Sequence, residues 1–311
     1  PGVSPVLLNG ETSDTLFIDS NKFALLGLTV PGKVSEFFCL VRNGSQTAVS
    51  GSGYAVYGSG AWLANGKWIN IAPANLGATE SNLADQLNHI PSSAYDKTVY
   101  GDWYQWGRKK DGHENRAIEA VGTEQFYKDS VFGVPVDSLD VNGQIQEDKT
   151  IYGKFIQRAS GTTFDWRDYP DADPNNTITS PADAWTWADA TNDPCKDPTS
   201  SLPSGFAWRV PSQSEWTQIY QNNTWVWHVG NINGYEIKPG GAARPTSFFL
   251  PTAGHRHRNG GNEVSVGSLG CYWSSTVTKT VSYNLYFLAD AIAPTSTYTR
   301  SFGMSVRCVA D

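Results

Sequence analysis

The sequence has little charge and almost no methionine: 17% of its 311 residues are Asp, Glu, Lys or Arg, and one residue is Met. It contains no apolar run near the ~20 residues that a membrane-spanning helix needs. No signal peptide is present, but a chain that starts at Pro1 resembles a mature form or an expressed fragment, so this absence excludes little. The net charge of −7 argues against nucleic acid as the partner.

Cysteine is also scarce, and the four residues present show no CxxC spacing, which argues against a zinc site. Four cysteines allow three pairings, and the sequence does not choose among them. A bridge between Cys195 and Cys308 would tie the middle of the main domain to its end. Free buried thiols are the alternative.

Motifs of the common enzyme classes are missing. The sequence has no Walker motif, no GxSxG, no HExxH and no GxGxxG between a strand and a helix. His255 and His257 would share one face of a strand and supply half of a metal site, with His228 and Glu263 as conceivable further ligands. Because arginines flank both histidines, we expect no metal there.

What the chain has in quantity is glycine and aromatic residues: 30 Gly, 12 Trp and 14 Tyr. This composition indicates a loop-rich globular protein of the α+β class with few helix formers. Residues 1–50 contain short apolar runs separated by turn dipeptides, which predicts a β-rich N-terminal segment or partial module. The pattern of residue types changes near residue 51, so we place the main domain at 51–311.

Local signals within the main domain predict several elements. Asn65-Gly66 between two apolar runs predicts a hairpin, and 81–89 and 181–190 are expected to be short helices. FAWRV (206–210) is predicted to be a strand. A helix is predicted to follow it, with a capping box formed by Ser212 and Glu215. The buried face of this helix is expected to contain Trp216, Ile219 and Tyr220. Residues 115–180 have few apolar runs and are predicted to be long surface loops.

The C-terminal run 248–308 is predicted to organise the domain. Alternation over 283–288 and again over 302–308 is typical of two strands. Between them, 289–301 is rich in small and hydroxyl residues and is expected to be a polar loop. A rigid strand pair that carries such a loop favours binding over chemistry.

A series of sequence blocks resembles one known family, the Fibrobacter-succinogenes-type major paralogous domain. This family is similar in fold to C-type lectins and, distantly, to formylglycine-generating enzymes. The resemblance covers roughly residues 52–311 and is carried, in order, by the blocks NLGA (75–78), GDWYQWGRK (101–109), NDPC (192–195), WRVPSQSEW (208–216), FFLPTAGHR (248–256), YWSST (272–276), LYF (285–287) and RSFGMSVRC (300–308).

The resemblance implies non-catalytic recognition outside the cell. The C-terminal segment of this family resembles the variable region of proteins that retroelements diversify in gut bacteria and their phages. Such proteins bind protein or glycan ligands as surface adhesins or phage receptor-binding proteins. The positions that match the unchanging framework are Trp273, Ser274, Ser275, Leu285, Phe287, Arg300, Gly303, Ser305, Val306 and Arg307.

The residues between the framework positions are the candidates for ligand binding. Tyrosines, serines and threonines in such places supply contact area and adaptable hydrogen bonds. The candidates are Tyr272, Thr278, Thr280, Tyr286, Leu288, Asp290, Ala293, Thr297, Tyr298, Ser301 and Phe302, with Trp225, Trp227 and His255 as a rim. We expect a binder to expose Tyr286, Tyr298 and Phe302.

Three alternatives remain beside this interpretation. A structural fimbrial or cell-surface subunit would bury the same side chains against a neighbour. A relative of formylglycine-generating enzymes would need a redox-active cysteine pair, for which only Cys271 and Cys308 are close in sequence. A structural calcium ion would fit the acidic loop of Asp165, Asp168, Asp171 and Asp173, although a solvated loop is commoner, so no cofactor is expected.

Overall fold

The computed structural model describes residues 59–118, 125–129, 134, 136–158, 165–167, 192–200, 202–203, 206–239, 247–278 and 281–310, together with the backbone of strands β1 to β4. The chain divides into two compact units, Pro1–Gly58 and Ser59–Asp311. The helix predicted over 181–190, the acidic residues beyond Asp165, and Thr280 lie outside the described residues.

The N-terminal unit consists of paired strands. β1 (Val34–Phe37) pairs antiparallel with β4 (Gly53–Val56), and β2 (Leu40–Asn43) pairs with β3 (Gln46–Val49). The predicted β-rich segment therefore extends through β4, and the unit boundary lies after Gly58 rather than near residue 50.

The second unit contains several small open sheets. Its hydrogen-bonded strand orders are β19-β6-β5, β10-β11-β12, β14-β13-β18-β7, β15-β16-β17 and β8-β9. All the pairs are antiparallel except β8 with β9. The strands are β5 (Gly60–Trp62), β6 (Trp68–Ile71), β7 (Tyr104–Gln105), β8 (Phe126–Asp129), β9 (Phe155–Arg158), β10 (Thr224–His228), β11 (Gly234–Lys238), β12 (Phe248–Pro251), β13 (His255–Arg256), β14 (Glu263–Val264), β15 (Gly270–Thr278), β16 (Val281–Leu288), β17 (Ala291–Thr299), β18 (Gly303–Met304) and β19 (Val309–Ala310).

Short helices complete the unit. The α-helices are α2 (Leu83–Asn88), α3 (Lys97–Tyr100) and α4 (Gln213–Asn222), and the 3-10 helices are η1 (Ala64–Gly66), η2 (Val136–Ser138) and η4 (Pro194–Lys196). The capping box of α4 is present: Ser212 Oγ accepts the Glu215 N–H at 3.2 Å, and the Glu215 carboxylate accepts the Ser212 N–H at 2.7 Å. Few helices and many strands in open sheets make this an α+β, loop-rich fold.

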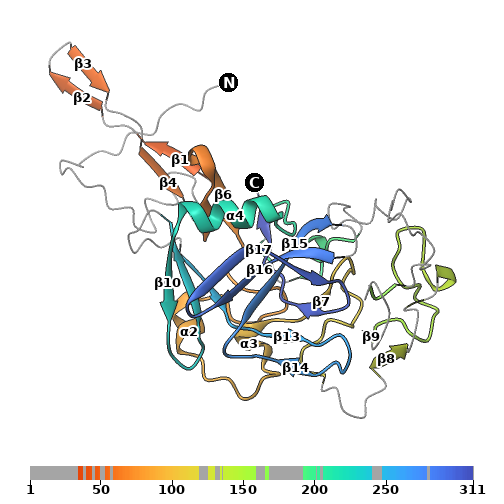
Figure 1. The fold of residues 1–311 in the computed structure, drawn as a ribbon. Coiled ribbons are helices and arrows are strands. Elements are labelled where there is room, and N and C mark those ends of the chain that lie inside the picture. Colours follow the sequence, from red (N-terminus) through yellow and green to blue (C-terminus); the bar gives the residue numbers. More distant parts are fainter. Residues whose placement is uncertain are drawn as a thin grey trace. The chain divides into compact units, whose positions relative to one another are not determined.

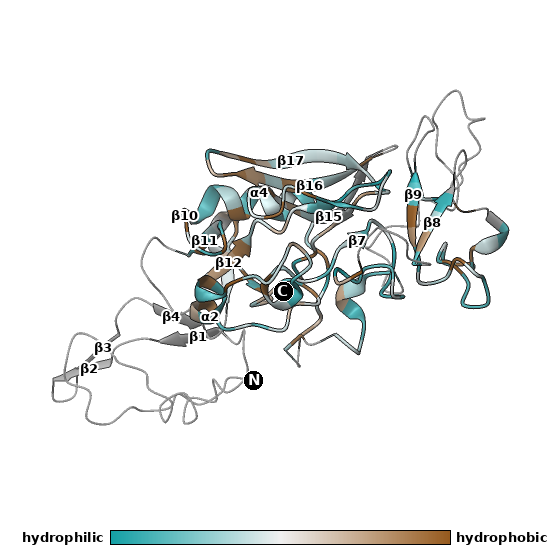
Figure 2. Cartoon of the chain, turned by 90° about the horizontal axis from the view of Figure 1, so that it is seen from below, coloured by the Kyte–Doolittle hydropathy of each residue, from teal (hydrophilic) through white to brown (hydrophobic). Residues whose placement is uncertain are grey.

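The sheet β15-β16-β17 separates two hydrophobic cores, and Figure 2 shows its strands in succession with β17 outermost. Because side chains alternate along a strand, Cys271 and Trp273 enter one core, whereas Tyr272, Leu285 and Phe287 enter the other. α4 packs against all three strands (Figure 1) and places Trp216 in the second core. The sheet is therefore fixed from both sides.

Several local predictions of elements are confirmed. The hairpin at Asn65-Gly66 joins β5 to β6, and Gly66 adopts a φ of 73°, which favours glycine. The predicted helix at 81–89 is α2, with Asn82 as its N-cap. The predicted buried face of α4 is confirmed for Trp216 and Ile219, which are fully buried, but not for Tyr220, which is 39% exposed.

Four predictions of elements are wrong. Residues 206–210 make only an isolated bridge from Arg209 to Val309 instead of a strand. The strand predicted over 302–308 is limited to β18, since this segment runs buried between neighbours on all sides. The predicted loop 289–301 is largely β17, which pairs with β16. The stretch 115–180 contributes buried apolar residues, including Trp166 and Ile156, besides surface loops.

Candidate functional site

Tryptophan side chains fix the backbone of β15. The Trp106 indole donates to the Ser274 carbonyl at 2.8 Å, and the Trp273 indole donates to the Tyr104 carbonyl at 2.7 Å. From the opposite face the Trp216 indole donates to the Trp273 carbonyl at 3.2 Å. All three rings are fully buried, so their hydrogen bonds hold β15 between the two cores.

Arg307 ties distant parts of the chain together behind this sheet. Its guanidinium donates twice to Asn75 Oδ1, at 3.0 and 2.7 Å, and once each to the carbonyls of Ala72 at 2.8 Å and Phe249 at 2.6 Å. Burial lowers the pKa of Arg307 to about 10. The side chain acts as a buried hydrogen-bonding centre.

One face of the sheet carries four candidate binding residues and is called the tyrosine face: Tyr286, Leu288, Ala293 and Tyr298. Tyr286 lies opposite Cys271 and Ala293, and Tyr298 lies opposite Ser282. All four side chains are partly exposed. At the border of this face the ring of Phe302 meets those of His255, His257 and Tyr298 edge-on, with centroids 5.2 to 5.3 Å apart.

Two further candidates are exposed next to the tyrosine face. Asp290 lies in the turn between β16 and β17, and Thr297 pairs with Tyr283, so that its side chain is on the opposite face of the outer strand. The backbone of Thr278 belongs to β15, and its side chain is outside the described residues.

Three candidates are not at the surface. Tyr272 is fully buried, because it alternates with Cys271 and Trp273 and enters the core below α4, where its hydroxyl donates to the Pro251 carbonyl at 2.7 Å. Ser301 is fully buried, and Phe302 is 9% exposed among aromatic rings. The prediction that these three residues contact a ligand from the surface is wrong for the described chain.

The predicted rim is divided between two faces. Trp225 and Trp227 on β10 pack on Tyr235, with ring centroids 5.6 and 4.9 Å apart, next to the core that contains Leu285 and Phe287. His255 borders the tyrosine face instead, 6.1 Å from the ring of Tyr298. The three residues therefore do not form one rim.

His255 on β13 and His257 just after it both pack against the aromatic ring of Phe302. Burial and the nearby His257 lower the pKa of His255 to about 4, so its ring is neutral at neutral pH. Glu263, a conceivable third ligand, accepts the hydroxyl of Tyr95, and the ring of His228 packs on Phe249. Within the described residues these side chains do not converge on one ion position.

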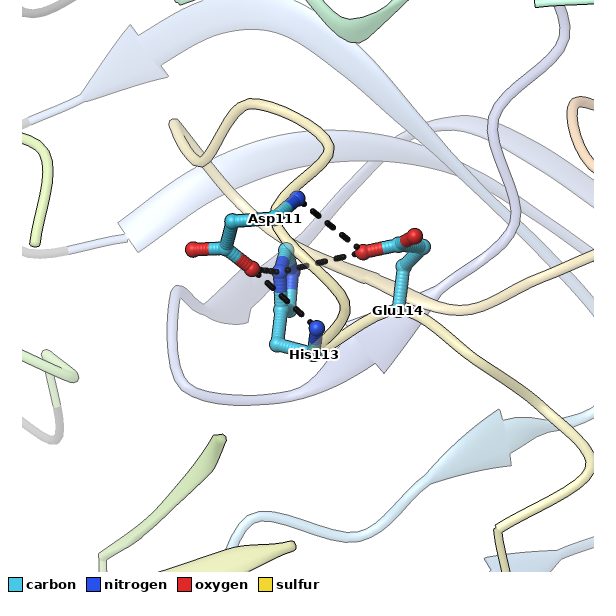
Figure 3. Close-up of side chains that lie close together, drawn as sticks. All are labelled: Asp111, His113 and Glu114. Atoms are coloured by element: carbon cyan, nitrogen blue, oxygen red, sulfur yellow. Dashed lines mark hydrogen bonds and ion pairs between the residues drawn. The ribbon is translucent and has the colours of Figure 1, made fainter. Parts of the chain in front are cut away.

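Asp111, His113 and Glu114 form a buried cluster whose ligand atoms all lie within 4.8 Å (Figure 3). His113 Nε2 accepts the Gln105 N–H at 3.1 Å, so Nδ1 carries the proton and donates to Asp111. Asp111 also pairs with Arg108 at 2.6 Å, which, with His113, holds the pKa of this buried carboxyl well below its usual range.

The hydrogen bonds of this cluster are those of a structural turn. Glu114 accepts the Gly112 N–H at 2.9 Å, and both imidazole nitrogens of His113 are engaged. A metal ion needs a free lone pair on histidine and unpaired carboxylates. The cluster therefore fits a hydrogen-bonded turn better than it fits an ion site.

Asp165 and the cysteines also have structural partners. Asp165 accepts from Arg300 at 3.0 Å and lies 3.8 Å from Arg167, so its charge is balanced by arginine. Cys195 and Cys308 form a disulfide, which decides between the two alternatives left open by the sequence. Cys271 is a buried free thiol, and burial raises its pKa. Because Cys308 is already bonded to Cys195, it does not pair with Cys271.

Sequence reasoning did not single out two buried polar residues of the tyrosine face, Ser282 and Asn284. Both are fully buried on the middle strand, and neither the Ser282 hydroxyl nor the Asn284 amide has a hydrogen-bond partner. The only signal in the sequence is a polar residue at alternate positions of a strand, which is equally typical of a solvated face.

Neither a family model, nor a curated protein, nor a solved structure matches this chain. Within the part of the chain that the structure describes, every helix is too short or too polar to cross a bilayer. The assignment from fold and site is thus an α+β protein with a half-exposed aromatic sheet face.

Proposed function

We propose that this chain is a non-catalytic ligand-binding protein that recognises its ligand through the tyrosine face. The scaffold is of the C-type-lectin-like type, and the protein acts outside the cell, on a bacterial surface or a virion. Its ligand is a protein or a glycan on a cell surface. A few aromatic anchors in a polar surround provide the binding energy.

One observation carries this proposal: side chains of the C-terminal sheet separate by role. The framework-matching residues Trp273, Leu285 and Phe287 are fully buried. Tyr286, Leu288 and Tyr298, which stand between framework positions, reach the surface of the same strands. A sheet held by buried residues can accept changes at its surface positions without losing its fold, as a diversified binding protein requires.

The resemblance to retroelement-diversified proteins extends the proposal to the origin of these surface side chains. Under it, Tyr286, Leu288, Asp290, Ala293, Thr297 and Tyr298 differ between copies of the gene while the framework stays constant. Tyrosine is suited to such positions because it offers a large rigid contact area and a hydroxyl at low entropic cost.

A binding screen with matched variants tests the proposal. The wild-type chain is screened against a glycan array and a panel of bacterial surface proteins, together with a face variant, Y286S/L288S/Y298S. The control, V226S/V229S, changes exposed residues of the β10 region, which are 39% and 76% exposed. We expect the face variant to lose at least about tenfold in affinity for every ligand found, which is about 1.4 kcal/mol.

The control is expected to bind as the wild type does. Equal binding by the face variant, or loss only in the control, would show that the tyrosine face is not the recognition surface. Circular dichroism of all three proteins checks that the substitutions leave the fold intact.

A further inference from the structure

Ser282 and Asn284 are buried polar residues whose side chains have no hydrogen-bond partner, whereas another buried amide of the described chain is fully bonded. Gln105, also fully buried, donates to the carbonyls of Ile156 and Ser301, each at 2.9 Å, and accepts the Ile156 N–H at 3.0 Å. By contrast, Asn284 Oδ1, Asn284 Nδ2 and Ser282 Oγ have no partner. Each such group costs about 1–3 kcal/mol of stability.

Asn284 lies where the strand pairing is interrupted on both sides. It is opposite Trp273 on β15 and Ser296 on β17. The pairing of β15 with β16 shifts register after Trp273, and the pairing of β16 with β17 shifts after Asn284. Such bulges re-aim side chains and are frequent beside binding sites. The irregularity keeps Asn284 from taking the neighbours that a regular ladder would provide.

Tyr298 lies on the same face of the sheet, next to this position. It starts on β17 opposite Ser282, and its ring lies 5.2 Å from that of Phe302 and 6.1 Å from that of His255. Its pKa is raised by burial and by Cys271 and Tyr286, which stand on the other two strands. The Tyr298 side chain thus belongs to the same face of the sheet as Ser282, Asn284 and Tyr286.

Tyr298 is a partly exposed side chain of this face. His255 Nδ1, at the border of the same face and next to the Tyr298 ring, is a further buried polar atom without a partner. Partnerless polar atoms from two different segments therefore lie in the neighbourhood of this ring.

The Asn284 amide defines the chemistry of the group that it would bind. A carboxamide presents a donor and an acceptor side by side, and the group that pairs with both is a second carboxamide. The neighbouring Tyr286, Leu288 and Tyr298 are apolar over most of their surface, which suits a methyl group. An acetamido group combines these two features.

Resting on the proposed function, we propose that Asn284 and Ser282 are the specificity determinants of the tyrosine face and bind the acetamido group of an N-acetylated sugar. The Asn284 amide exchanges two hydrogen bonds with the acetamido group, and Ser282 adds a third. The sugar ring stays outside and stacks on Tyr286. Glycans are favoured over peptides because the four residues of the tyrosine face carry no charge and two of them, Tyr286 and Tyr298, offer hydroxyls.

A nuclear magnetic resonance titration tests this proposal. The probes are N-acetyl-D-glucosamine, D-glucosamine and D-glucose, and the signal is the side-chain amide resonance of Asn284 in the full chain. We expect saturable shifts with the N-acetylated sugar only. In Asn284→Leu we expect affinity to fall by about tenfold or more, as followed by the backbone amides of Tyr286 and Leu288.

Thermal unfolding of Asn284→Leu provides the second readout. Because leucine removes two unpaired polar atoms at similar volume, this variant is expected to be as stable as the wild type or more stable. A clear loss of stability would show that the amide is satisfied inside the folded protein, for instance by bound water, and would overturn the proposal. Absence of shifts with the N-acetylated sugar, or equal shifts in Asn284→Leu, would overturn it too.

The remaining outcomes separate this proposal from the proposed function. Shifts with a glutamine-containing tripeptide, without shifts by the sugar, would overturn the assignment to glycans. A ligand from the binding screen that depends on Tyr286 but not on Asn284 would overturn the acetamido site and leave the recognition function standing. A ligand that ignores all three residues of the face variant would contradict the recognition function itself.

Discussion

At the scale of single residues, the fold depends on buried polar side chains that reach across long sequence separations. Arg307 makes four hydrogen bonds to three residues in two distant segments and has no carboxylate partner among them. The left-handed Gly77, with a φ of 85°, lies against Asp102, so closely that any side chain would collide with the carboxylate. The NLGA and GDW blocks are thus explained by packing.

The Arg307 network predicts a large loss of stability on truncation. In Arg307→Met, Asn75 Oδ1 and the carbonyls of Ala72 and Phe249 keep their burial but lose their donors. At about 1–3 kcal/mol for each unsatisfied group, we expect the free energy of unfolding to fall by about 3–5 kcal/mol. Urea denaturation measures this loss, and a change below about 1 kcal/mol would contradict the assigned role.

Asp102 predicts a pH dependence of stability. Burial raises its pKa from 3.8 to about 6 in the folded chain. Between these values the folded state holds the proton more tightly than the unfolded state, so stability from this group falls as the pH rises from about 4 to about 6. Asp102→Asn removes the titration and keeps an acceptor for the Arg116 N–H, which Asp102 Oδ1 accepts at 3.1 Å.

The measurement for Asp102 is the free energy of unfolding of both proteins at pH 4 and pH 6. We expect the variant to gain about 2–3 kcal/mol relative to the wild type between these two values. Parallel pH profiles for the two proteins would show that Asp102 does not titrate with a raised pKa. Asp193, whose pKa burial also raises to about 6, titrates in both proteins and cancels in the difference.

At the scale of elements, local chemistry was predictable and long-range pairing was not. The capping box of α4 and the Asn65-Gly66 hairpin depend on a few adjacent residues and were found from the sequence. β17 was missed because Pro294 and a run of hydroxyl residues resemble a loop, and its strand state depends on pairing with β16. Pairing of β8 with β9 was likewise invisible to local patterns.

The candidate site was predictable from the sequence only where it depends on alternation along one strand. Alternation placed Tyr286 and Leu288 on one face of a strand, but it left open which face packs inside, so Tyr272 was assigned to the wrong side. The roles of Trp225 and Trp227 depend on β11, which supplies Tyr235 between them and the core. Such contacts arise only when the whole domain assembles.

The disulfide links η4 to the segment before β19 and predicts a specific loss. It closes a loop of 113 residues in sequence separation, which constrains the unfolded chain. We expect C195A/C308A to lower the free energy of unfolding by about 2–5 kcal/mol. The matched control is Cys271→Ala, which removes a buried thiol and no bridge; an equal loss in both proteins would contradict a stabilising role of the bridge.

At the scale of the whole molecule, the second unit combines a buried framework with one partly exposed aromatic sheet face. Two cores hold the β15-β16-β17 sheet from opposite sides, and their side chains tolerate little change in volume. Tyr286, Leu288 and Tyr298 pack against one of these cores with part of their surface and leave the rest exposed. The proposed function therefore requires that the buried framework stays constant and that the exposed side chains of the tyrosine face vary between copies of the gene.

Sequencing this gene and its flanks in many isolates tests that claim most directly. The account predicts that substitutions concentrate at adenines in the codons of Tyr286, Leu288, Asp290, Ala293, Thr297 and Tyr298, with a template copy and a reverse transcriptase gene nearby. The codons of buried residues such as Trp273, Leu285 and Arg307 are predicted to stay constant. A constant tyrosine face, or substitutions spread equally over buried and exposed positions of these strands, would contradict it.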